Sequence, residues 1–176
     1  SLHDALPISS RRVVAVASAA GLLTQLGGAP YSVTKHAAVG FAEWLSISYG
    51  DAGIGVSCVC PMGVDTPLLH SMTESPDAEL RVAGAAVTNS ANVIGPDVVA
   101  ALAVESIGTG QFLVLPHPEV LQMYQRKGAD YDRWIAKGLK DHPRLEKQAG
   151  KRGRAKQSKE RNLLMRMKEK RAEVLR

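Results

Sequence analysis

Three short apolar runs alternate with longer segments of helical periodicity, and this alternation limits the fold more than any other feature of the sequence. The runs cover residues 13–17, 54–60 and 111–115. Each is too short for an ordinary helix, is almost continuously apolar and is bounded by Gly, Pro or charged residues. These features predict three strands that are buried on both faces.

The segments between the runs predict helices. Apolar residues recur at helical spacing after Tyr31 until Gly50 stops the pattern, and Pro96 stands where the first turn of a helix tolerates its missing N–H. Residues 21–30 are rich in Gly and predict a loop, and residues 67–80 predict a short helical or irregular segment. The expected helices cover residues 31–49, 98–107 and 119–140.

The resulting order, β–α–β–α–β–α, predicts an α/β protein with a parallel sheet, because helical crossovers of this length join parallel strands. It corresponds to half of an open doubly wound sheet. Three buried strands are few for such a sheet, since a parallel strand without a neighbour exposes backbone groups and apolar side chains. We therefore expect a further part of the sheet upstream of this sequence.

Composition fits a single soluble domain. The 176 residues are 45% hydrophobic and 22% charged, and no apolar run approaches the ~20 residues of a membrane span. Cys58 and Cys60 share one face of a predicted strand, which is poor disulfide geometry, and no neighbouring residues complete a metal site. We expect buried free thiols, no bound metal and a cytoplasmic protein.

The positive charge is concentrated at the C-terminal end. Residues 151–176 carry 11 Lys and Arg against three Asp and Glu, whereas residues 1–150 carry 11 against 14. This segment predicts a solvated tail, disordered or forming an isolated helix. Binding of nucleic acid or of an anionic membrane would involve these 26 residues only, and we do not expect it.

Polar side chains follow the first two predicted strands. Ser18 comes just after the first strand, Tyr31 and Lys35 open the following helix, and residues 61–66 form the loop after the second strand. Ligands of open α/β sheets bind at the carboxyl ends of the strands, where all of these residues can meet.

The spacing of Tyr31 and Lys35 has a chemical reason. Residues four apart lie on one face of a helix, and a nearby ammonium favours the phenolate form of tyrosine, which suits general acid–base work. Ser18 can donate its hydroxyl hydrogen to a substrate carbonyl. Taken singly, each residue has an ordinary interpretation as a surface or solvated helix residue, so the prediction depends on the joint pattern.

That joint pattern resembles the short-chain dehydrogenase/reductase family. It consists of Ser18, the Tyr-Ser-Val-Thr-Lys run of residues 31–35 and the Val-Cys-Pro-Met-Gly-Val-Asp-Thr run of residues 59–66. The resemblance extends over about residues 13–137 and includes the Asp-Tyr-Asp-Arg-Trp run of residues 130–134. It implies the C-terminal half of a Rossmann-type sheet and a hydride transfer between NAD or NADP and an alcohol or ketone.

The resemblance also implies roles for individual residues. Tyr31 would transfer the proton, and Lys35 would bind the nicotinamide ribose beside it. The catalytic set would be Ser18, Tyr31 and Lys35, and the nicotinamide end of the cofactor would be held by Tyr31, Lys35, Pro61, Gly63, Val64 and Thr66. Part of the helix over 31–49 would pack across a homo-oligomer interface, and an apolar substrate pocket would include Leu68, Leu69, Met72 and Leu80.

Residues 1–12 depart from the family. They contain none of its Gly-x-x-x-Gly-x-Gly turn, and we expect a non-family segment over 1–12, a partial catalytic domain over 13–150 and a basic tail over 151–176. Such a truncated member could instead be a non-catalytic fragment or an interaction domain, because the pyrophosphate of the cofactor binds at that turn. Met62, inserted between Pro61 and Gly63, is a small variation.

Four further residues stand outside the predicted catalytic set. We expect His36 to lie at the surface, and Trp44, with Phe41 and Leu45, to be a packing residue. His117 follows the third strand and is either a turn residue or part of the substrate cleft. Trp134 is expected to pack the C-terminal helix onto the domain.

Overall fold

The computed structural model describes the backbone of residues 11–174, and the side chains of this range except 148, 152–157, 164 and 168–174. Most of the predicted N-terminal segment, residues 1–10, therefore lies outside the described residues. The domain boundaries proposed above stay predictions.

The sheet has three parallel strands in the described residues, β1 (Arg11–Val16), β2 (Ile54–Val59) and β3 (Leu113–Val114), in the order β1-β2-β3. The α/β class and the parallel direction are confirmed. β3 is shorter than predicted, because only two of its residues pair in the ladder with β2.

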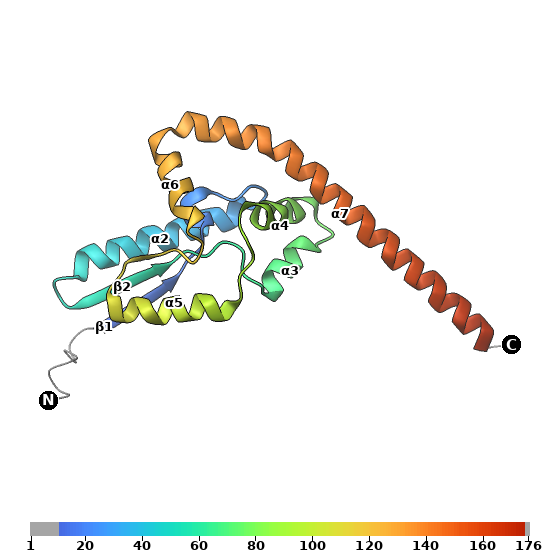
Figure 1. The fold of residues 1–176 in the computed structure, drawn as a ribbon, viewed down its shortest axis with the longest axis horizontal. Helices are drawn as coiled ribbons and strands as arrows, with labels where there is room; N and C mark the ends of the chain where they lie inside the picture. Colours follow the sequence, from blue (N-terminus) through green and yellow to red (C-terminus); the bar gives the residue numbers. More distant parts are fainter. Residues whose placement is uncertain (1–10, 175–176) are drawn as a thin grey trace.

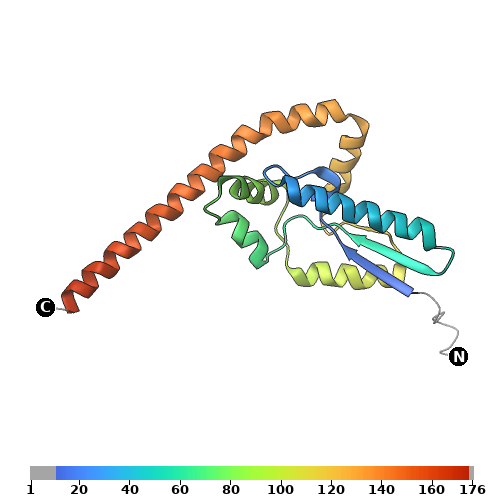
Figure 2. The ribbon, with the colours of Figure 1, turned by 180° about the vertical axis from the view of Figure 1, so that it is seen from behind.

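Helix α2 (Ala29–Tyr49) packs against β1 and β2, and helix α5 (Pro96–Thr109) packs against all three strands. The two helices lie on opposite faces of the sheet (Figures 1 and 2). Both were predicted: α2 begins two residues before the predicted helix and ends at the same residue, and α5 is two residues longer at each end. Pro30 and Pro96 stand in the first turns of these helices, where a missing N–H costs no hydrogen bond.

Three shorter helices complete the body. Helix α1 (Ala20–Leu23) extends into the segment predicted as a loop, so Gly21 is a helical residue and not a breaker. Helix α3 (Pro67–Thr73) lies in the segment predicted as helical or irregular. Helix α4 (Ala78–Ser90) was not predicted, although Asp77 is an N-cap whose carboxylate accepts from the N–H groups of residues 79 and 80.

The single helix predicted over 119–140 is wrong. The chain forms α6 (Glu119–Ala129) and α7 (Tyr131–Val174), because Asp130 is extended and its carboxylate accepts from Arg133 N–H at 2.8 Å. The basic segment is helical, as one alternative predicted, but it continues α7, which also contains Pro143. Among the described helices, none combines the length and the apolar character that crossing a bilayer requires.

The core lies between β2, α1, α2 and α6. Cys58 and Cys60 are free and fully buried, as predicted, with their sulfur atoms 3.8 Å apart. The hydrogen bond with Cys58, together with burial, holds the pKa of the Cys60 thiol well above its ordinary value. The buried cluster consists of Ala17, Ala19, Leu22, Leu23, Ala42, Val56, Cys58, Cys60 and Val120.

One expectation about burial is wrong. Val13 and Val16 of β1 are exposed, so the first apolar run is not covered on both faces. Phe41 and Trp44 of α2 are 61% and 52% exposed, with their ring centroids 5.8 Å apart. His36 is exposed and Trp134 packs against the core, both as predicted.

Candidate active site

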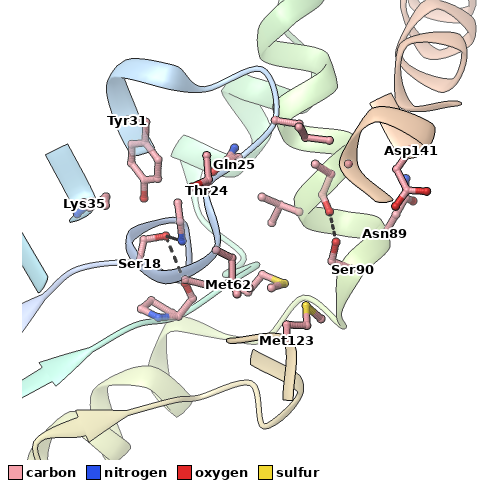
Figure 3. A pocket seen from close by; sticks show the side chains of 18 of the residues that line it. Ser18, Thr24, Gln25, Tyr31, Lys35, Met62, Asn89, Ser90, Met123 and Asp141 are labelled. Carbon is pink, nitrogen blue, oxygen red and sulfur yellow. Dashed lines mark hydrogen bonds between the residues drawn. The ribbon is translucent and has the colours of Figure 1, made fainter. Parts of the chain in front are cut away.

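A cleft opens where β1 and β2 end, between the segments that follow these strands and the helices α3, α4, α6 and α7 (Figure 3). Its volume is about 1550 Å³. Small-molecule sites commonly have volumes of about 300–1,000 Å³, so this cleft has room for two ligands side by side.

Ser18 leaves β1 and enters the cleft just before α1. Its Oγ accepts from Ala20 N–H at 3.1 Å and donates to the carbonyl oxygen of Pro61 at 3.4 Å. The second hydrogen bond is long, so the hydroxyl hydrogen is held weakly and can turn toward a ligand oxygen.

Tyr31 and Lys35 lie on one face of the first turns of α2. The Lys35 ammonium nitrogen is 5.6 Å from the centroid of the Tyr31 ring and donates to the carbonyl oxygen of Val16 at 3.3 Å. The hydroxyl of Tyr31 points toward the segment that carries Ser18 (Figure 3). The structure therefore brings all three predicted residues to one cleft.

The close approach of α1 to α2 depends on Gly21. A Cβ atom at this position would lie 2.5 Å from the carbonyl oxygen of Lys35, which no larger residue can tolerate without a shift of the backbone. Ser32 adds a second tie, since its Oγ accepts from Gln25 N–H at 2.8 Å. Sequence reasoning missed this role of Gly21; the only available signal is a glycine three residues after Ser18.

The loop after β2 lines the cleft with Pro61, Met62, Val64 and Thr66, but not with Gly63. Gly63 is buried, and a Cβ atom there would lie 3.3 Å from the side chains of both Val87 and Val93. A glycine at position 63 is therefore explained by close packing against these two side chains, and not by close approach to a ligand. Its carbonyl oxygen accepts from Ile94 N–H at 3.0 Å.

Thr66 is the N-cap of α3. Its hydroxyl donates to the carbonyl oxygen of Val64 at 3.2 Å and accepts from Leu69 N–H at 3.4 Å. The single hydroxyl hydrogen is therefore engaged, and the group can meet a ligand amide only as an acceptor.

Residues 7–77 match the sequence model of the family described as short chain dehydrogenase, and this range contains Ser18, Tyr31, Lys35 and the loop over 61–66. Over these residues the chain is similar to the short-chain dehydrogenase/reductase family. Residues 78–176 lie outside this match.

Known proteins are similar to parts of this chain. Momilactone A synthase of Oryza sativa subsp. japonica is 36% identical over 96 residues, which are 53% of this chain and 34% of the synthase. An NAD-dependent oxidoreductase of Mycobacterium tuberculosis is 40% identical over 58 residues, 33% of this chain and 21% of the relative.

A solved structure is similar over a larger part. A short chain dehydrogenase/reductase from Burkholderia phymatum, in complex with NAD, superposes with a TM-score of 0.57 and 28% identity over 70% of this chain and 48% of that chain. The present chain therefore spans less than half of the length of these relatives.

The residues that line the cleft fit the nicotinamide end of a dinucleotide. The lining includes Tyr31 with its hydroxyl, Lys35 with its ammonium, and the 61–66 loop with the apolar side chains of Met62 and Val64. A flat ring with an amide and a ribose needs such a combination of hydrogen-bonding and apolar groups.

Leu68, Leu69 and Met72 line the cleft and make the part next to α3 apolar, as expected. Leu80 does not line it; its side chain is exposed on α4. Residues that the sequence did not indicate also line the cleft, among them Thr24, Gln25, Met123 and Trp134. Thr24 has a φ of 65°, an unusual conformation for a β-branched residue.

His117 lies below the cleft and does not line it. Only 2% of its surface is exposed, so the cleft alternative is wrong and the turn alternative holds. Lys127 of α6 is also buried; its ammonium donates to the carbonyl oxygen of Leu22 at 2.6 Å and joins α6 to α1. No sequence signal distinguishes Lys127 from a solvated helix lysine.

Proposed function

We propose that the whole protein that contains this chain is an NAD- or NADP-dependent oxidoreductase that interconverts an alcohol and a ketone. The observation that supports the proposal is the meeting of Ser18, Tyr31 and Lys35 at one end of a cleft with an apolar far side. A bound nicotinamide supplies or accepts the hydride at the carbonyl carbon.

Three side chains of this chain orient the substrate oxygen and transfer its proton. Ser18 turns its weakly held hydrogen from the Pro61 carbonyl to the substrate oxygen and orients it. In reduction, Tyr31 donates its phenolic proton to the oxygen, which completes the alcohol; in oxidation it takes this proton back. Lys35, 5.6 Å from the ring centroid, stabilises the negative charge that Tyr31 acquires.

Lys35 has a second proposed role at the nicotinamide ribose, and the Pro61, Val64 and Thr66 side of the loop holds the carboxamide end of the cofactor. Gly63 supports this loop by packing against Val87 and Val93. The acid–base role and the binding role of Lys35 are separable by experiment, since one acts on turnover and the other on affinity.

Tyr31→Phe tests the proposal. We expect turnover to fall by about 10²–10⁴-fold, the usual contribution of a positioned acid–base group, with little change in nicotinamide affinity because the ring is retained. The measurement is oxidation of NADH and NADPH with a panel of ketones, together with a fluorescence titration of the nucleotide. Tyr49→Phe, at the exposed end of the same helix, is the matched control.

Turnover of Tyr31→Phe within threefold of the parent would reject Tyr31 as the proton donor. Lys35→Ala should weaken both affinity and turnover. A protein that binds neither nucleotide would instead be a non-catalytic interaction domain of this fold.

We also propose that α2 contributes to a homo-oligomer interface. Its outer face exposes apolar side chains, including Phe41, Trp44 and Ile47, at 61%, 52% and 78%. Trp44→Glu should lower the mass of the particle in light scattering, whereas Val104→Glu, at an exposed apolar position on α5, should not. An unchanged mass for Trp44→Glu would remove α2 from the interface.

The two free buried thiols support a reducing environment. We therefore propose the cytoplasm as the location of the whole protein. Cell fractionation tests this, and recovery of the protein in an oxidising compartment would contradict it.

A further inference from the structure

His117 makes two hydrogen bonds, both to backbone groups of other segments. Its Nδ1 lies 3.1 Å from the backbone nitrogen of Met62, and its Nε2 lies 3.0 Å from the carbonyl oxygen of Asn92. The ring therefore joins three connections of the fold: the loop after β2, the segment before α5 and the end of β3.

The two partners fix the state of the ring. A backbone N–H can only donate and a carbonyl oxygen can only accept, so Nδ1 must be the acceptor and Nε2 must carry the hydrogen. The buried imidazole is thus neutral, with its hydrogen on Nε2. With the hydrogen on Nδ1 instead, this N–H would face the Met62 N–H, and the bare Nε2 would face the carbonyl oxygen of Asn92.

Met62 is the residue of the loop that needs this support. Its neighbours are held by backbone bonds, since Asp65 N–H donates to the carbonyl oxygen of Ile94 at 2.8 Å and Ile94 N–H donates to that of Gly63. Met62 N–H instead depends on a side chain, His117. The neighbouring Pro61 carbonyl accepts from both Ala19 N–H and the Ser18 hydroxyl, at 2.8 and 3.4 Å.

From these contacts we infer that His117 is a positioning residue. By accepting from Met62 N–H, it fixes the position of the backbone of the 61–66 loop at the cleft. The inference rests on the proposed function, because that loop is proposed to bind the nicotinamide. His117 touches neither cofactor nor substrate and acts through the backbone of Met62 and Pro61. Loss of its acceptor lets the loop move away from both Ser18 and the nicotinamide.

Two variants separate positioning from mere structural support, because each keeps one of the two hydrogen bonds. In His117→Asn the amide oxygen takes the place of Nδ1 and still accepts from Met62 N–H. In His117→Gln the amide nitrogen takes the place of Nε2 and still donates to Asn92. A purely structural histidine predicts equal effects of the two substitutions.

The experiment uses the whole protein and measures hydrogen exchange at Met62, affinity for NADH and NADPH, and melting temperature. We expect His117→Gln to lose protection at Met62 and to weaken nucleotide binding about tenfold, because a buried donor is left without a partner. His117→Asn should keep protection at Met62 and parent affinity within about threefold, with a similar loss of melting temperature. Equal losses of affinity in both variants, or full affinity in His117→Gln, would overturn the inference.

A measurement on the parent protein decides the matter if neither variant folds. Long-range ¹H–¹⁵N spectra distinguish the two imidazole tautomers, and the structure predicts hydrogen on Nε2. Hydrogen on Nδ1 would overturn the inference. Absence of nucleotide binding by the parent would refute the proposed function, and the tautomer and the exchange at Met62 would still test the bond between His117 and the loop.

Discussion

Strands β1 and β2 pair residue for residue, with Val16 opposite Val59, but the two side chains have opposite surroundings. Val59 is fully buried, and 61% of Val16 is exposed. β2 has a parallel neighbour on each side, whereas β1 has one among the described residues. Burial of an apolar strand is therefore set by its place in the sheet and not by its own composition.

The largest expected effect comes from placing a carboxylate at each of these paired positions. Val59→Asp should prevent folding, because an unpaired buried charge costs at least several kcal/mol against a total stability of ~5–15 kcal/mol. Val16→Asp should cost less than about 1 kcal/mol in residues 1–176, as surface substitutions do. Urea denaturation measures both.

The same pair of substitutions in the whole protein sharpens the comparison. A large loss from Val16→Asp there would mean that a further segment covers the free side of β1. Equal losses from both substitutions in residues 1–176 would contradict the difference in burial.

The residues that follow β1 are buried, unlike Val13 and Val16 of the strand itself. They lead into α1, which packs against α2. Gly21→Ala should lower stability by about 1–3 kcal/mol, since the added methyl would overlap the carbonyl oxygen of Lys35. Gly40→Ala, on the open side of α2 with no atom nearby, should instead stabilise by about 0.5–1 kcal/mol. Thermal melts measure both, and a neutral Gly21→Ala would show that α1 can move away from α2.

The smallest expected effect concerns the thiols of β2. The hydrogen bond between the two thiols raises the pKa of Cys60, which burial raises further, and lowers that of Cys58. Because the folded protein keeps the Cys60 proton that an unfolded thiol releases, Cys60 should lower stability as the pH rises above about 8.5, and Cys58 should offset part of this loss. Cys58 and Cys60 should resist an aromatic disulfide reagent until the protein unfolds, whereas a thiol introduced by Val16→Cys should react at once. Rapid labelling of the two native thiols would refute the burial of β2.

The sequence predicted the elements that pattern and periodicity specify directly. Helices α2 and α5 and strand β2 have strong signals, namely continuous apolar runs, helical spacing and terminal Pro or Gly. The candidate site was found because Ser18, Tyr31 and Lys35 follow strand ends, where the topology of a parallel sheet brings side chains together.

The remaining features depend on contacts between distant residues. The exposure of Val16 depends on which strands stand beside β1, and the burial of Lys127 depends on the carbonyl of Leu22, 105 positions away. His117 is placed below the cleft by Met62 and Asn92, and none of the three is close to another in sequence. Local signals at Asp77 and Asp130, both N-caps, could have marked the starts of α4 and α7.

Pro143 gives α7 a mechanical property that its length alone would not suggest. The proline removes the N–H that would bond to the Leu139 carbonyl, and its ring crowds the preceding turn, so the helix bends most easily there. The helix lines the cleft as far as Arg144 and Leu145, just after Pro143, while its longer remaining part extends away from the sheet (Figure 1). A load applied to the far end passes first to α4, because the Arg81 guanidinium donates to the carbonyl oxygen of Ala149 at 3.2 Å, and bending at Pro143 attenuates what is transmitted further along the helix.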